Sequence, residues 1–144
     1  MFKFRLESLL SYRKFIEDKL QRELNEFKRL LEEEKEKMKA YKDKRKLILD
    51  KLKEKECEDL SITELTVCIS FIEILSEDIE QQKKMLKEMD DKLEQKRQDL
   101  IEAQKKKKML EKLKLKQWKF YLHDLNKKEE KFLSEVTINR FNQK

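Results

Sequence analysis

Few residues in this chain could carry out covalent or metal chemistry. His123 is the only histidine, and Cys57 and Cys68 are the only cysteines. Histidine is the usual general base, but a base or a metal ligand needs partners that a polar helix surface around His123 does not provide. The cysteines form no CxxC unit and have no histidine close in sequence, so we expect free thiols in a reducing cytosol rather than a zinc site. We therefore expect a protein without catalytic residues, metal ion or cofactor.

Charged side chains leave two further chemistries to consider. The chain has no glycine for a phosphate-binding loop, and its many carboxylates suit i,i+4 ion pairs or a solvated face. The run Lys105–Lys108 could contact nucleic acid, or it could be a solvated face beside an acidic partner helix. A net charge of +6 without a recognition motif favours the second interpretation, so no nucleic-acid partner is expected. Residues 1–20 could lie on a membrane surface, although their alternating Glu and Arg favour a protein groove.

Composition limits the elements that can position these groups. Of 144 residues, 47% are charged and none is Gly or Pro, which predicts very few chain reversals. Hydrophobic residues make up 38%, enough for a narrow buried stripe. Disorder is the alternative for so charged a chain, but the apolar residues recur at regular spacing.

The start of the chain is charged throughout, unlike a signal peptide, and no apolar run approaches a membrane span. We expect a protein that is cytosolic or peripheral to a membrane.

Heptad repeats of apolar residues predict two long helices that pack together. In the second half, one heptad position holds Leu65, Ile72, Ile79, Leu86, Leu93 and Leu100, and the other holds Cys68, Leu75, Gln82, Met89, Lys96 and Ala103. In the first half, one heptad position holds Leu24, Leu31, Met38, Arg45 and Leu52. The other holds Phe27, Glu34, Tyr41 and Ile48. Upstream, Phe2, Leu9 and Ile16 recur every seven residues, and the step from Leu20 to Leu24 shifts the frame as a stutter would.

A capping box marks the point where the two halves meet. In Ser61-Ile62-Thr63-Glu64, the Ser61 hydroxyl would accept from the Glu64 N–H, and the Glu64 side chain would reach back to the Ser61 N–H. Leu60 and Leu65 would occupy the staple positions. A short connection between long helices implies an antiparallel hairpin. We expect an all-α fold, a single domain over residues 1–144. It would be a long antiparallel two-helix coiled-coil hairpin, with a helix over about 4–57, a turn at about 58–61 and a helix over about 62–141. The second helix would project past the N-terminus, which would lie near residue 115.

The charge distribution predicts two different partners. Residues 56–82 contain eight acidic residues and no Lys or Arg, whereas residues 105–119 contain eight Lys and one acidic residue. The acidic stretch should carry a negative potential that attracts a basic partner. Phe71 is the only aromatic residue between Tyr41 and Trp118. It could widen the core near the turn, or it could be an exposed anchor for a partner's groove.

Three short motifs resemble those of a known family. The opening Phe2-x-Phe4-Arg5-Leu6-Glu7-x-Leu9-Leu10-x-Tyr12-Arg13 is similar to the start of the flagellar export protein FliJ. Phe71-Ile72-x-x-Leu75-x-x-x-Ile79 resembles that family's helix after the hairpin turn, and Lys128-Glu129-x-x-Phe132-Leu133-x-Glu135 resembles its tail. The resemblance implies a non-enzymatic component of the bacterial flagellar type III export apparatus.

The resemblance also implies partners and binding residues. It implies contacts with the hexameric export ATPase, the export gate protein FlhA and flagellar export chaperones. The protein would be a monomer in the cytoplasm, associated with the inner face of the cell membrane only through the apparatus. The gate contact would use Phe71, Leu75, Asp78 and Gln82, and the ATPase-ring contact would use Phe2, Phe4, Leu6, Leu9 and Leu10. The alternative interpretation is a general coiled-coil scaffold or adaptor, which should dimerise; a basic nucleic-acid-binding coiled coil is a third.

Overall fold

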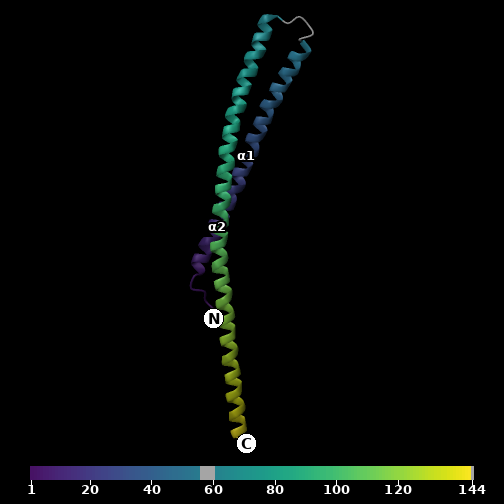
Figure 1. Cartoon of the computed structure of the whole chain (residues 1–144). Helices are drawn as coiled ribbons and strands as arrows, with labels where there is room; N and C mark the ends of the chain where they lie inside the picture. The colour runs from purple at the N-terminus through teal and green to yellow at the C-terminus, as the bar shows by residue number, and fades with distance from the viewer. Residues whose placement is uncertain (56–60, 144) are drawn as a thin grey trace. The chain divides into compact units, whose positions relative to one another are not determined.

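The computed structural model of the chain describes residues 1–55 and 61–143, and it contains two long helices in those ranges (Figure 1). Helix α1 spans Glu7–Lys55 and helix α2 spans Ile62–Asn142. The described residues include no β-strand. Neither helix is interrupted, because the chain has no Gly or Pro to break one. Of the turn expected at 58–61, residues 58–60 lie outside the described part.

The start of α2 shows one half of the expected capping box, and Leu60 of the expected staple lies outside the described residues. The Glu64 N–H donates a hydrogen bond to the Ser61 hydroxyl oxygen over 3.2 Å, and the Leu65 N–H donates to the Ser61 carbonyl over 3.1 Å. The first of these bonds satisfies an N–H group that has no partner within the first turn, and the second is the first regular backbone bond of the helix. Arg140 in the last turn lies where a cation is favourable to the helix dipole.

The start of α1 differs from the expected one. The helix begins at Glu7 rather than near residue 4, and the Glu7 N–H donates to the Phe4 carbonyl over 3.2 Å. Phe4 is buried, with 7% of its surface exposed. Phe2 and Phe4 therefore precede the helix. The expectation that Phe2 continues the heptad of Leu9 and Ile16 is wrong, because residues outside a helix do not follow its period.

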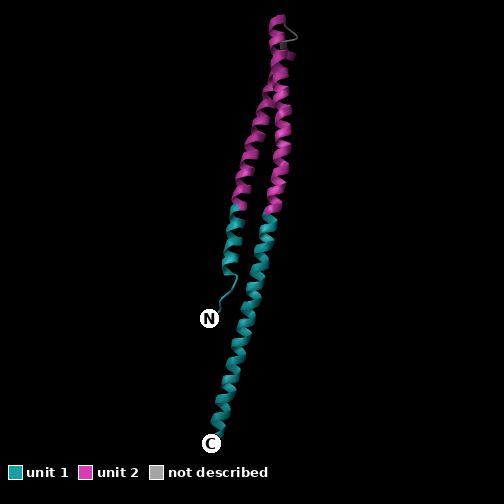
Figure 2. Ribbon diagram, turned by 90° about the vertical axis from the view of Figure 1, so that its left-hand side faces the viewer, with its two compact units in different colours: residues 1–19, 100–144 teal, residues 20–99 magenta. Residues whose placement is uncertain are grey.

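The contacts of the chain divide into two compact units, shown in Figure 2. Unit 2 comprises residues 20–99, and its two helical segments run antiparallel: Gln82 of α2 bonds to Glu34 of α1, whereas Lys96 lies over the ring of Phe27. The buried residues of this unit are Leu24, Leu31, Leu75, Ile79 and Leu93. All five occupy heptad core positions expected from the sequence.

Unit 1 comprises residues 1–19 and 100–144. It is also antiparallel, because Glu17 pairs with Lys107 and Glu7 pairs with Lys114. Its buried residues are Phe4, Leu10, Leu100 and Ala103. Both units are therefore consistent with a coiled-coil hairpin, and the ring of Phe2 lies 5.2 Å from that of Trp118, close to the expected position. The single domain stays a prediction.

Burial along α1 contradicts the expected stutter. Apart from the half-buried Ile16 and Gln21, the buried or half-buried residues of this region recur at alternating steps of three and four: Leu10, Arg13, Glu17, Leu20, Leu24, Phe27 and Leu31. The heptad therefore continues through Leu20–Leu24 without a shift in frame. The prediction was wrong because charged residues, Arg13 and Glu17, occupy core positions there, and a count of apolar residues alone does not find them. Leu9, expected in the core, is exposed.

Candidate protein-binding surfaces

The four residues expected at the gate contact lie on α2 in unit 2, but they do not share one environment. Phe71 is 49% exposed, whereas Leu75 is 5% exposed. Asp78 and Gln82 are half-buried. The exposed ring of Phe71 is the one apolar group of the four that a partner could reach without displacing α1.

Gln82 is engaged in a contact between the two helices of unit 2. Its side-chain amide donates to the Glu34 carboxylate over 2.6 Å and to the Glu34 carbonyl over 3.1 Å. The Lys37 ammonium lies 3.2 Å from the same carboxylate. The Gln82 hydrogen bond, followed by that of Lys37, lowers the pKa of Glu34 from its ordinary value. Gln82 and Leu75 thus hold α2 against α1. Both side chains lie between the two helices of unit 2.

Exposed apolar residues extend the surface around Phe71. Val67 and Ile74 are 63% and 56% exposed, and they lie four residues before and three residues after Phe71. On a helix, this spacing places all three side chains on one face, with Asp78 next along it. We call Val67, Phe71, Ile74 and Asp78 the Phe71 strip. Sequence reasoning missed Val67 and Ile74 because it followed the heptad core positions, although their i, i+4, i+7 spacing was a usable signal.

The antiparallel segment of α1 weakens the negative potential expected around Phe71. Residues 61–82 carry five acidic side chains and no basic one, but the antiparallel segment of α1 in the same unit, residues 35–54, carries nine Lys or Arg against four Asp or Glu. Packed helices lie about 8–10 Å apart, within about one Debye length at physiological salt. The basic segment therefore largely offsets the acidic one. Reading charge along the chain alone could not show this pairing.

The five residues expected at the ATPase-ring contact also divide by exposure. Phe4 and Leu10 form part of the core of unit 1, at 7% and 1% exposed. Phe2 is half-buried against two rings of α2, with ring centroids 5.2 Å from Trp118 and 5.6 Å from Tyr121. Leu6 and Leu9 are each 38% exposed. Only Leu6 and Leu9 of the five therefore present much apolar surface to a partner.

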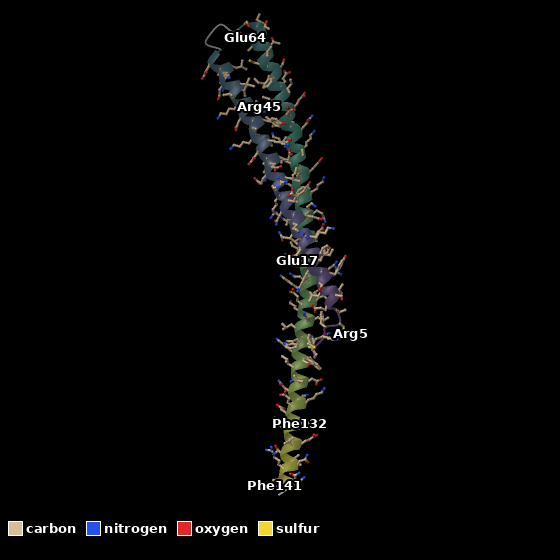
Figure 3. All side chains as sticks on the ribbon, turned by 180° about the vertical axis from the view of Figure 1, so that it is seen from behind. Arg5, Glu17, Arg45, Glu64, Phe132 and Phe141 are labelled. Carbon is tan, nitrogen blue, oxygen red and sulfur yellow. The ribbon has the colours of Figure 1, made fainter. Side chains whose placement is uncertain are left out.

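Two ion pairs join α1 to α2 in unit 1. The Glu17 carboxylate lies 2.5 Å from the Lys107 ammonium, and the Glu7 carboxylate lies 2.8 Å from that of Lys114. The hydrogen bond to Glu17, together with nearby negative charges, raises the pKa of Lys107 from its ordinary value. Figure 3 labels Glu17 on the α1 side of this contact. Lys107 thus faces α1, although it belongs to the run Lys105–Lys108.

In the described part of the chain, the histidine and cysteine considered for covalent or metal chemistry have no cluster of metal-binding side chains around them. No three His, Cys, Asp or Glu side chains come together there as a metal site would require. Cys68 is a free thiol, half-buried in unit 2 at its expected heptad position, and His123 is exposed. Cys57 lies outside the described residues. Within residues 1–55 and 61–143, neither helix contains a stretch long and apolar enough to cross a membrane.

Comparisons with known proteins agree with this architecture. A solved structure, described as that of a YscO homolog from Chlamydia trachomatis, is similar to this chain with a TM-score of 0.56 and 20% sequence identity. The match covers 94% of this chain and 93% of that one, and at this identity it supports the two-helix fold alone. A search of curated protein sequences found no match. The model of the flagellar FliJ protein family matches residues 2–144, nearly the whole sequence, and the chain therefore belongs to the FliJ family.

Proposed function

We propose that this chain is a non-enzymatic coupling component of the flagellar type III protein export apparatus, which links the export ATPase ring to the gate protein FlhA and handles export chaperones. The family match over residues 2–144 supports the assignment to flagellar export. The observation that carries the coupling role is that each unit presents its own exposed apolar surface: the Phe71 strip in unit 2, and the terminal segments in unit 1. Two partners would then bind at separate places, one on each unit.

For the FlhA contact, the exposure pattern refines the set of residues. Phe71 and Asp78 would meet the gate protein directly, with Val67 and Ile74 beside them. Leu75 and Gln82 would act by keeping α2 in register with α1, because their side chains lie in the helix pair. An exposed aromatic ring that enters a partner's pocket usually contributes more than the residues around it.

For the ATPase ring, Leu6 and Leu9 would make the contact, while Phe2, Phe4 and Leu10 would hold the N-terminal segment on α2. We also propose that the C-terminal part of α2 projects beyond α1 and takes part in this contact. Every side chain from Leu122 to Gln143 except Val136 is exposed, which supports the proposal. These include Phe132 and Phe141, at 64% and 79% (Figure 3). The chain would be a monomer that reaches the inner face of the membrane through its partners.

The test compares Phe71→Ala with wild type in binding to the cytoplasmic domain of FlhA. We expect binding about 30-fold weaker or more, since loss of an aromatic anchor costs at least about 2 kcal/mol and each factor of ten is about 1.4 kcal/mol. Glu77→Ala, an exposed position on the same helix, is the matched control and should bind nearly as wild type. Helicity and melting temperature should change little, because Phe71 is half exposed.

Wild-type affinity in a folded Phe71→Ala protein would reject the gate contact at this strip. Ionic strength gives a second readout. Since the basic segment of α1 offsets the acidic segment of α2, we expect only a small effect of salt on the association rate. A steep decrease in the association rate with salt would mean that the partner binds the acidic face of α2 without contacting the basic residues of α1.

A further inference from the structure

A row of lysines follows one face of α2 in unit 1. Its members are exposed and recur at steps of three or four residues: Lys105, Lys108, Lys112, Lys116 and Lys119. At 3.6 residues per turn, they lie within about 80° of one another around the helix, and they extend about 21 Å along it. We call these five residues the lysine stripe.

The lysine stripe has no ion-pair partner in the described part of unit 1. None of the five lysines has an ion pair there, whereas Lys107 and Lys114 face α1 and are paired with Glu17 and Glu7. The core positions Ala103 and Leu110 share the face of Lys107 and Lys114, so the stripe lies on the opposite side of α2 from α1. From residue 103 to residue 123 the only acidic residue is Glu111. Glu111 lines a groove with residues of the α1 side, among them Leu10 and Lys14.

We infer that the lysine stripe is a docking surface for an anionic lipid membrane, on which this part of α2 would lie flat. A straight, one-sided row of cations matches a plane of anionic headgroups, and clusters of four to eight basic residues on a helix are typical of such binding. The stripe shares no residue with the contacts proposed for FlhA and the ATPase ring, and it would add a direct lipid contact to the membrane association proposed through those partners.

Apolar residues along the stripe favour a membrane over a nucleic acid. Met109 and Phe120 flank one edge of the stripe at 70% and 71% exposed, and Leu115 flanks the other at 53%. Beside a bilayer, such side chains can enter the boundary between headgroups and acyl chains while the lysines stay in the headgroup layer. A nucleic-acid surface usually adds arginine for bidentate contacts and several aromatic rings for stacking. Between Arg97 and Arg140 the chain has no arginine, and Phe120 is the one ring beside the stripe.

The experiment measures flotation of the full chain with mixed phosphatidylglycerol and phosphatidylcholine vesicles, and with vesicles of phosphatidylcholine alone, at physiological ionic strength. We expect binding to the anionic vesicles only. Replacing all five stripe lysines by glutamine should weaken that binding by at least about 100-fold, because each lysine near an anionic surface contributes on the order of fivefold. Replacing Met109 and Phe120 by serine should weaken binding to the same vesicles, without weakening binding to a DNA duplex.

The matched control replaces five exposed lysines of α1 in unit 2 by glutamine: Lys28, Lys39, Lys42, Lys46 and Lys53. That face also carries Glu32, Asp43 and Asp50. The control therefore lowers the net charge by the same amount, but it removes lysines that have acidic neighbours on the same face. It should bind the anionic vesicles nearly as tightly as wild type. Equal losses in the two variants would mean that binding follows net charge alone, and would overturn the proposal.

Two further outcomes would also overturn it. One is that the wild-type chain does not float with anionic vesicles. The other is that a DNA duplex, added at equal anionic charge, displaces the chain from them, which would make the stripe a nucleic-acid surface instead. Circular dichroism on each variant shows whether the helices are intact, and glutamine at these exposed helix positions preserves helix propensity.

Discussion

At the residue scale, side chains that share a heptad position differ in burial. Ile79 is 1% exposed, whereas Leu86, seven residues later, is half-buried. We predict that Ile79→Ala lowers the free energy of unfolding by about 2–5 kcal/mol, and that Leu86→Ala falls near or below the lower end of this range. Urea denaturation followed by circular dichroism measures both. Met85→Ala, at an exposed neighbouring position, is the control and should change stability little.

Equal losses for Ile79→Ala and Leu86→Ala would mean that the two positions are buried alike in solution, contrary to the structure. The polar contact between Gln82 and Glu34 lies between these two positions on α2. A polar residue at a core position lowers stability but favours one alignment of the helices over others. This explains how Gln82 can matter to the fold without contacting a partner.

At the scale of an element, the N-terminal segment contains both core and exposed apolar residues. We predict that replacing Leu6 and Leu9 together by serine reduces any stimulation of ATP hydrolysis by the export ATPase at least several-fold, because these two leucines present the exposed surface of the segment. The melting temperature should change little, since Phe4 and Leu10 remain in place. Steady-state hydrolysis by the purified ATPase, with and without the chain, measures the effect.

Tyr12→Ser, which alters another exposed ring of α1, is the control for the double leucine variant. Full stimulation by the folded double variant would show that Leu6 and Leu9 are not in the contact. Deleting residues 1–12 is a less specific experiment, because it also removes Phe4 and Leu10 from the core of unit 1. Its effect could come from unfolding as well as from a lost contact.

The sequence predicted the helices better than it predicted the surfaces. The heptad positions from Leu24 onward, except the exposed Leu65, and the cap at Ser61 depend on local spacing and local hydrogen bonds, which a sequence displays directly. The roles of Glu17, Leu75 and Gln82 depend on which side chain lies opposite each of them, and only the packed pair shows that. The same reason explains why the acidic stretch of α2 was expected to dominate its surroundings, although α1 brings basic residues beside it.

At the scale of the whole molecule, the proposed monomer requires that α1 and α2 of one chain pair with each other. We predict that cysteines placed at Glu34 and Gln82, whose side chains form a hydrogen bond, crosslink within one chain when Cys57 and Cys68 are replaced by serine. Non-reducing electrophoresis should show a faster monomer band, and light scattering should give the mass of one chain. A pair at Glu34 and Lys92 should fail to crosslink.

Crosslinks found only between chains, with the mass of a dimer, would contradict the hairpin and favour the general coiled-coil scaffold. That outcome would leave the pairing of Glu34 with Gln82 intact but assign it to two molecules. The mass measurement therefore decides between two architectures that share the same helix contacts.

The contact of Phe2 with Trp118 has an optical consequence. Trp118 is the only tryptophan of the chain, and the rings of Phe2 and Tyr121 lie 5.2 and 5.8 Å from it. All indole fluorescence of the native protein therefore originates in unit 1, where the emission wavelength follows the polarity that the N-terminal segment creates. Far-ultraviolet ellipticity, in contrast, sums over both helices. Recorded together during unfolding, the two signals would separate release of the N-terminal segment from melting of unit 2, without any added label.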